Sequence, residues 1–286
     1  MRSQNNYIDR VFVFAAEKDY LVLEYSLPAI RKNLKAKSYF LVCDNFTFSK
    51  FFVKNDLIPG FKILSEQQIL GSSLKKCSLI KNKNLRNWYK QQILKLILID
   101  SSNQDEIVLI WDGDTIPLKP LNFLKNNTLG YYISNEFHTP YHNAIEYLLG
   151  LKNPQSYSFV AQCFIARVYW IKLMIKSIES RHKCSYIDSI IKIANVSKLQ
   201  NFSEYETMAA FIQRYFFFDT FIIKNSWFRY GYSICGSPAN LDNVKDYFDY
   251  ISFESWDSSL LRTIIIRIIF APSFFLRHIK KWKQYV

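Results

Sequence analysis

Two aspartates separated by one glycine, Asp112 and Asp114, are the residues whose types and spacing point most directly to chemistry. They follow the run from Ile107 to Trp111, which is typical of a buried strand because it is apolar on both faces and turn residues follow it. The carboxylates therefore stand at the carboxyl end of a strand, where open α/β sheets bind ligands. The loop that carries them has no basic residue before Lys119, so they repel each other unless a cation lies between them. Carboxylate oxygens suit Mg²⁺ or Mn²⁺, and the pattern predicts metal ligands.

A solvated turn is the alternative explanation of this pattern, with Asp114 capping the next segment. The surrounding residues favour the metal site. A buried strand precedes the aspartates, and the segment that follows, from Thr115 to Leu121, contains proline and apolar residues without Ser or Asn.

The segment from Trp111 to Leu121, WDGDTIPLKPL, resembles the metal-binding segment of GT-A glycosyltransferases. Within them it is similar to a bacterial family of sugar transferases found among lipopolysaccharide and capsule proteins. The likeness covers most of the chain from Asp19 to about Gly236 and includes three further stretches: WYKQQILKL (88–96), NEFHTPYHNAIEY (135–147) and FSEYET (202–207). It implies a hexosyltransferase with a nucleotide-diphosphate sugar donor, a saccharide or lipid-linked acceptor, and Mn²⁺ or Mg²⁺ held by Asp112 and Asp114.

The predicted fold is α/β: a GT-A-like, Rossmann-related mixed sheet flanked by helices. Apolar strands alternate with helical segments in the first half, which favours parallel, doubly wound pairing. Only seven glycines occur, and no Gly-rich phosphate loop is present, so the usual dinucleotide and P-loop sites have no support. The expected strands are 11–15, 39–43, 61–64, 107–111, 129–134, 158–167 and an edge strand at 227–235. The expected helices are 20–35, 88–100, 168–180, 182–200 and one that follows the cap residue Ser203 and runs to 215, and 74–87 is expected to be a surface loop.

Four residues of the first half are candidate donor contacts. Asp19 follows the first strand, where the resemblance implies a ribose or base contact, although capping the next helix is an alternative. Gln91 and Gln92 belong to the stretch 88–96 that carries the resemblance. Lys95 lies four residues after Gln91, on the same helix face. If that face meets the metal site, Lys95 binds the diphosphate; otherwise it is a solvated lysine.

Four polar residues follow the strand expected at 129–134. Glu136, His138, Tyr141 and His142 are predicted to bond donor or acceptor hydroxyls, with loop packing as the alternative. The two histidines are four residues apart, but Pro140 disfavours a continuous helix between them, so a zinc pair is disfavoured.

A second group of acidic residues lies at 203–206. Ser203 followed by Glu206 is the capping-box pattern, in which the glutamate reaches back to the helix start; Glu206 is also a candidate substrate contact. Glu204 is then the candidate catalytic base that takes the acceptor's proton, alongside Asp114 at the metal. An exposed surface position is the alternative for Glu204, and a retaining enzyme would need no such base. Gln162 interrupts an apolar run and faces either the cleft or the core.

The formal charge of +13 indicates an anionic partner. No zinc finger, RNP motif or basic recognition helix is present, so nucleic acid is disfavoured. The five cysteines are scattered, which is typical of reduced thiols in the cytoplasm, and no signal peptide is recognised. Residues 257–286 are apolar and basic but interrupted by Arg262, Arg267 and Pro272, too short for a spanning helix.

Two domains are therefore expected. Residues 1–256 form the transferase domain, and residues 257–286 form a basic amphipathic helix that lies on the anionic inner face of the cell membrane or packs on the domain. The alternative function is a non-catalytic, membrane-associated protein of GT-A form that binds a nucleotide or glycan.

Overall fold

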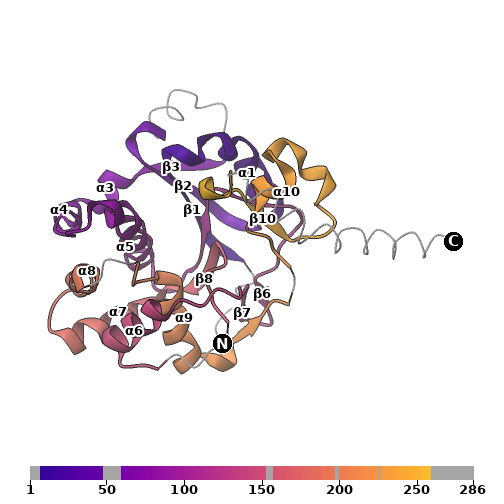
Figure 1. Ribbon diagram of the computed structural model, residues 1–286. Helices are drawn as coiled ribbons and strands as arrows, with labels where there is room; N and C mark the ends of the chain where they lie inside the picture. Colours follow the sequence, from indigo (N-terminus) through magenta and orange to yellow (C-terminus); the bar gives the residue numbers. More distant parts are fainter. Residues whose placement is uncertain (1–6, 48–58, 153–156, 197–199, 225, 259–286) are drawn as a thin grey trace. The chain divides into compact units, whose positions relative to one another are not determined.

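The computed structural model describes residues 7–47, 59–152, 157–196, 200–224 and 226–258 (Figure 1). The chain divides into two compact units. Unit 1 comprises Met1–Glu17, Leu34–Asp112 and Asn122–Lys224, and unit 2 comprises Lys18–Asn33, Gly113–Leu121 and Asn225–Val286.

A five-stranded sheet forms the centre of unit 1. Its spatial order is β3-β2-β1-β4-β8, in which the first four strands are parallel and β8 runs antiparallel to β4. The mixed α/β fold expected from the sequence is confirmed. The strands are β1 (Ile8–Ala15), β2 (Ala36–Cys43), β3 (Phe61–Ser65), β4 (Ile107–Asp112) and β8 (Cys163–Arg167).

The helices of unit 1 supply the cover for this sheet. In Figure 1, α4 to α9 lie together, to the left of and below the sheet. The central helix α7 packs against α5, α6, α8 and α9. The helices are α3 (Glu66–Leu70), α4 (Ser73–Ser78), η2 (Lys83–Leu85), α5 (Arg86–Ser101), α6 (Thr139–Leu149), α7 (Val168–His182), α8 (Tyr186–Val196), α9 (Glu204–Tyr215) and η3 (Phe217–Asp219).

A second, three-stranded sheet in unit 1 has the order β6-β7-β9, formed by β6 (Leu124–Lys125), β7 (Thr128–Tyr131) and β9 (Thr220–Ile222). The turn between β6 and β7 consists of Asn126 and Asn127, with φ of 49° and 64°. Asparagine tolerates this left-handed conformation, which a tight two-residue hairpin requires.

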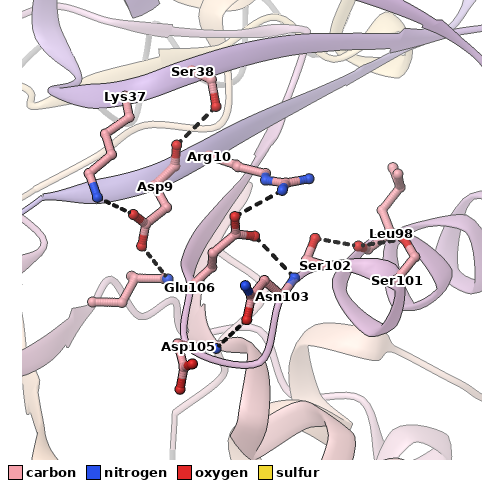
Figure 2. Close-up of polar contacts among 11 residues, drawn as sticks. Asp9, Arg10, Lys37, Ser38, Leu98, Ser101, Ser102, Asn103, Asp105 and Glu106 are labelled. Carbon is pink, nitrogen blue, oxygen red and sulfur yellow. Dashed lines mark hydrogen bonds and ion pairs between the residues drawn. The ribbon is translucent and has the colours of Figure 1, made fainter.

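Ion pairs join the strands at the amino edge of the five-stranded sheet, where β1, β2 and β4 begin (Figure 2). Lys37 Nζ lies 2.6 Å from Asp9 Oδ1, and the Ile107 N–H donates to Asp9 Oδ2 at 2.8 Å. Arg10 Nη2 lies 2.8 Å from Glu106 Oε1. One carboxylate thus links three strands and holds their register.

Unit 2 is built around α1 (Tyr20–Asn33), which follows the short helix η1 (Glu17–Asp19), and the antiparallel pair β5 (Thr115–Pro117) and β10 (Tyr250–Ser252). Ser26 Oγ donates to the Gly113 carbonyl at 2.8 Å, and Asn33 Nδ2 donates to the Pro117 carbonyl at 2.9 Å. These bonds fasten α1 to the segment after the first aspartate. The remaining elements are α10 (Gly231–Cys235), η4 (Pro238–Asn243) and η5 (Ser255–Ser258), and the core contains Val22, Ile116, Phe228, Val244, Phe248, Ile251 and Phe253.

Two predictions of local structure are wrong. The surface loop expected at 74–87 contains α4, η2 and the start of α5, because Cys77 and Ile80 are buried and anchor the segment. The edge strand expected at 227–235 contains single bridges at Phe228 and Tyr230 and then α10. A Cβ at Gly231 would lie 2.6 Å from the Ser252 carbonyl oxygen, so glycine permits this close turn into the helix.

The helix α6 begins at Thr139, with Pro140 in its first turn, where proline lacks no hydrogen bond. Proline therefore starts this helix, and His138 precedes it as the cap residue. Among the described helices, none is long and apolar enough to cross a membrane. The predicted boundary at 256 stays a prediction, since the segment 259–286 lies outside the described residues.

Candidate active site

A buried lysine joins three elements of unit 1 at the carboxyl end of β4. Lys95, on α5, has a side chain that is 3% exposed. Its Nζ lies 2.8 Å from Asp112 Oδ1 and 2.9 Å from Glu204 Oε1, and it donates to Tyr205 Oη at 2.9 Å. Tyr205 Oη in turn donates to Asp112 Oδ1 at 3.1 Å. We call Lys95, Asp112, Glu204 and Tyr205 the carboxyl-edge cluster.

The charges of this cluster are unequal, since one ammonium faces two carboxyl groups. Burial opposes the charged form of Lys95, but Asp112 and Glu204 outweigh it, so the pKa of Lys95 is raised and the side chain stays protonated. Burial also raises the pKa of Glu204, against the opposing effect of Lys95. The pKa of Tyr205 is raised well above its ordinary value by burial and by both carboxylates, so its hydroxyl keeps its proton.

Asp112 keeps one carboxylate oxygen for a ligand. Lys95 and Tyr205 both bond Oδ1, the side chain is 17% exposed, and no described residue donates to Oδ2. The Asp112 N–H donates to the Gln162 carbonyl at 2.9 Å, which ties the end of β4 to the start of β8. The side chain of Asp112 is therefore fixed through one oxygen while the other remains available.

Gln162 has an uncommon backbone conformation for its residue type, with φ of 61°. The left-handed region costs a non-glycine residue about 1–2 kcal/mol. Gln162 is only 6% exposed. Both alternatives considered from the sequence, a position facing the cleft and a position in the core, are consistent with this burial. Its conformation aims its carbonyl at the Asp112 amide.

Two further predicted residues, Asp19 and Asp114, lie in unit 2, and both act electrostatically on Tyr232. Asp19 and Asp114 are 5% and 8% exposed. Burial raises the pKa of Tyr232, and the negative charges of Asp114, Asp19 and Asp257 raise it further. The Asp114 carbonyl accepts from the Phe253 N–H at 2.7 Å. Asp19 and Asp114 therefore lie close enough to one tyrosine for both to act on it, and Tyr232 was not predicted from the sequence.

The amino end of α9 is held by two side chains. Ser203 Oγ accepts from the Glu206 N–H at 3.3 Å, which confirms Ser203 as the cap residue. Gln92 Oε1, on α5, accepts from the Glu204 N–H at 3.2 Å. Gln92 is therefore committed to α9, and Gln91 beside it is half-buried. The exposed surface position considered for Glu204 is wrong, because the residue is 1% exposed.

The capping-box role of the Glu206 side chain is also wrong. Its Oε1 accepts from Ser158 Oγ and, at 2.9 Å, from the Phe159 N–H, so it fastens α9 to a distant segment. Oε2 is buried, and no described residue bonds it. Burial raises the pKa of Glu206, which the bonds from Ser158 and Phe159 oppose.

The other predicted polar residues lie around the start of α6. His138 Nε2 lies 2.6 Å from the Gln200 carbonyl oxygen, and its ring centroid is 4.4 Å from that of Tyr141. His142 packs beside Phe137, while His142 and Glu136 act electrostatically on Glu206. The structure thus gathers Glu136, His142 and Glu206 into one group.

The donor atoms fit a divalent ion that shares its coordination with a substrate. Among the described residues, no group of three or more His, Cys, Asp or Glu side chains could hold a metal ion by itself. Asp112 offers a hard carboxylate oxygen, Oδ2, to which no described residue donates, and Mg²⁺ characteristically takes one or two carboxylates plus phosphate oxygens. The residues present therefore fit an ion bound together with a diphosphate.

A model of a protein family described as a family of unknown function (DUF6492) matches residues 17–235. The chain belongs to this family. No curated protein matches the chain.

Three solved structures show a similar arrangement of elements. Mouse xyloside xylosyltransferase 1, in its apo form, has 8% identity and a TM-score of 0.46 over 87% of this chain and 98% of its own. The WbbM bifunctional glycosyltransferase has 11% identity and a TM-score of 0.47 over 88% of this chain and 46% of its own. The galactosyltransferase LgtC, in complex with donor and acceptor sugar analogues, has 13% identity and a TM-score of 0.44 over 85% of this chain and 86% of its own. We base the functional proposal on the site, because these likenesses are too distant to carry it.

Proposed function

We propose that this protein is a metal-dependent glycosyltransferase of the GT-A type. It moves a sugar, of hexosyl type, from a nucleotide-diphosphate sugar to a saccharide or lipid-linked acceptor in the synthesis of lipopolysaccharide, capsule or another cell-surface polysaccharide. The observation that carries the proposal is the Asp112 carboxylate, held through Oδ1 by Lys95 and Tyr205 with Oδ2 left available. The resemblance of the segment from Trp111 to Leu121 supports the same assignment.

Asp112 and Asp114 are the proposed metal ligands. A bound Mn²⁺ or Mg²⁺ would neutralise charge on the diphosphate leaving group. The chain's own contribution is to hold Asp112 in one orientation, which the ammonium of Lys95 and the hydroxyl of Tyr205 do through the same oxygen, Oδ1. A ligand oxygen that is already oriented loses less freedom when the ion and the diphosphate bind.

Lys95 is better placed to hold Asp112 than to touch the diphosphate. Its side chain is 3% exposed and bound to two carboxylates. We therefore assign Lys95 as a positioning residue. The general-base role of Glu204 stays a prediction: its carboxylate is also buried, and it would have to leave Lys95 to take the proton of an acceptor hydroxyl.

The other residues predicted to contact the substrate belong to the proposed site. Glu136, His138, Tyr141, His142 and Glu206 surround the start of α6 and carry groups that bond sugar hydroxyls. Asp19 and Gln91 are proposed donor contacts, and the basic segment 257–286 is proposed to bind the inner face of the membrane.

The first experiment is thermal unfolding of the purified chain with a panel of nucleotide sugars, each with and without Mn²⁺. A ligand at 100 times its dissociation constant adds about 2.7 kcal/mol to the free energy of unfolding, enough for a clear rise in Tm. We expect a Mn²⁺-dependent rise with one nucleotide family. Asp112→Asn should remove the Mn²⁺ dependence, and Asp105→Asn, at an exposed loop position, should keep it. A rise that is equal with and without Mn²⁺ in both variants would overturn the metal assignment.

A non-catalytic protein that binds nucleotide or glycan is the second candidate, favoured by the burial of Glu204 against Lys95. It predicts the same rise in Tm but neither transfer nor hydrolysis of the bound donor. Release of the free nucleotide, followed by chromatography with a mixture of saccharide acceptors, separates the two candidates.

A further inference from the structure

Three aromatic side chains at the end of α9 project into water. Tyr215 is 58% exposed, Phe217 57% and Phe218 93%. Exposed apolar side chains are ordinary when scattered, but three within four residues form a patch that calls for a partner. We call Tyr215, Phe217 and Phe218 the aromatic tip.

The backbone of the aromatic tip is held in place. The Phe216 N–H donates to the Ile212 carbonyl at 2.7 Å, and the Asp219 N–H donates to the Phe216 carbonyl at 3.0 Å. Thr220 Oγ1 donates to the Phe217 carbonyl at 2.7 Å and accepts from Gln213 Nε2 at 3.2 Å. The chain therefore closes a hydrogen-bonded turn that keeps the tip outside.

Phe216 shows how the turn separates its aromatic residues. Its ring stacks on Trp170 with centroids 4.7 Å apart, and Tyr169 lies against its edge at 5.8 Å. The Phe216 ring anchors the turn to α7, so the exposed rings of the aromatic tip extend from a packed turn. Tyr215 contacts Phe211 on its own helix, and Phe217 and Phe218 contact each other, yet all three rings stay more than half exposed.

The charges beside the tip favour an anionic partner. Arg214 precedes it and Lys224 follows β9, both exposed, and Asp219 is the opposing charge in this segment. Long cationic side chains beside apolar rings suit an anionic lipid surface, where the rings enter the headgroup region and the cations stay at the phosphates.

The area of the tip is small for a stable protein partner. An aromatic side chain presents about 150–250 Å², so the three rings at their exposed fractions offer on the order of 400 Å². A stable protein complex buries about 800 Å² on each partner. A narrow projecting tip of this size fits insertion into lipid better than a second copy of the chain.

We propose that the aromatic tip inserts into an anionic lipid surface and gives unit 1 a membrane contact of its own. The inference rests on the proposed function only for the lipid-linked character of the acceptor. This membrane contact is additional to the one proposed for the basic segment 257–286, and it is made by residues that the structure describes.

The test is cosedimentation of the full chain with vesicles of phosphatidylcholine, alone or with phosphatidylglycerol, at physiological salt. The double variant Phe217→Ser/Phe218→Ser removes the two phenylalanines of the tip. The matched control, Leu79→Ser/Val196→Ser, removes two side chains that are 64% and 86% exposed elsewhere in unit 1. We expect at least a tenfold weaker partition of the tip variant into the anionic vesicles and less than a twofold change for the control.

Equal partition of the two variants would overturn the proposal. It would also be overturned if the wild-type chain sedimented as a dimer without lipid and the tip variant as a monomer, since the occupant would then be a second copy. The Mn²⁺-dependent rise in Tm, measured on the same variants without vesicles, separates this failure from failure of the proposed function. A tip variant that keeps the rise and keeps vesicle binding contradicts only the membrane contact.

Discussion

The two edges of the five-stranded sheet both carry lysine–carboxylate pairs, but they differ in burial and in charge balance. At the amino edge, Lys37 is 58% exposed beside Asp9, and Arg10 is 34% exposed beside Glu106 (Figure 2). At the carboxyl edge, Lys95 is 3% exposed and faces both Asp112 and Glu204. At the amino edge, each cation pairs with one carboxylate, and both cations are accessible to water. At the carboxyl edge, one buried ammonium faces two carboxyl groups, and Oδ2 of Asp112 is left available for a cation.

The largest expected difference between the edges follows from removing their lysines. Lys95→Met leaves Asp112 and the buried Glu204 without a cation, and breaking a buried pair in this way costs about 3–5 kcal/mol. Lys37→Met is the matched control and should cost much less, because Lys37 is itself 58% exposed and the Asp9 carboxylate keeps the bond from the Ile107 N–H. Urea unfolding at neutral pH measures both.

Equal destabilisation by these two variants would contradict the comparison. Lys95→Arg keeps the charge and should recover part of the loss, which separates the role of the charge from that of the packing. If Lys95→Met does not fold, the stabilities of Lys95→Arg and Lys37→Met still test whether a change at Lys95 costs more than a change at Lys37.

The second difference concerns tyrosine hydroxyls. Tyr205→Phe removes bonds to a carboxylate and an ammonium, and bonds to charged groups are worth about 1.5–3 kcal/mol. Tyr39→Phe removes bonds to the Ala36 N–H and the Leu34 carbonyl, and such neutral bonds are worth about 0.5–1.5 kcal/mol. We expect the larger loss of stability from Tyr205→Phe.

The affinity for Mn²⁺, measured by titration of the nucleotide-bound protein, is a second way to compare Tyr205→Phe with Tyr39→Phe. Tyr205→Phe loosens Asp112 and should weaken Mn²⁺ binding, whereas Tyr39→Phe should not. Unchanged Mn²⁺ affinity in Tyr205→Phe would show that Lys95 alone orients the carboxylate.

The sequence predicts well what depends on neighbouring residues. The buried strands, the helix from about 88 to 100, the aspartates at the end of β4 and the Ser203 cap all follow from local patterns. The surface loop at 74–87 was wrong because its many lysines and asparagines conceal the two buried residues, Cys77 and Ile80, that fold it.

The sequence does not predict contacts between distant segments. Lys95 meets Tyr205 across 110 positions, and Ser158 meets Glu206 across 48. The capping-box spacing placed the glutamate near Ser203, but a buried serine from elsewhere offered its carboxylate a better donor than the helix start. Tyr205 stands beside Glu204 in the stretch FSEYET, so its position carried a signal, but its residue type alone did not reveal its bond to Asp112.

The smallest expected difference concerns the dependence of stability on pH near α9. Burial raises the pKa of Glu206, so the folded chain binds this proton more tightly than the unfolded chain. The stabilisation is complete below the unfolded pKa of about 4.3 and is lost as the pH rises through the folded pKa, by at most about 1.4 kcal/mol per pH unit.

Glu206→Gln keeps an oxygen acceptor for Ser158 and Phe159 but has no carboxyl proton to lose. Its stability relative to the wild-type chain should therefore rise with pH. Urea unfolding of both proteins between about pH 4 and 8 measures this difference and cancels the other carboxyl groups, including those of the amino edge. Ser158→Ala removes a bond that opposes the effect of burial, so in that variant the loss should move to higher pH. A difference between Glu206→Gln and the wild type that stays constant over this range would mean that Glu206 keeps an ordinary affinity for its proton, and that water reaches its second oxygen.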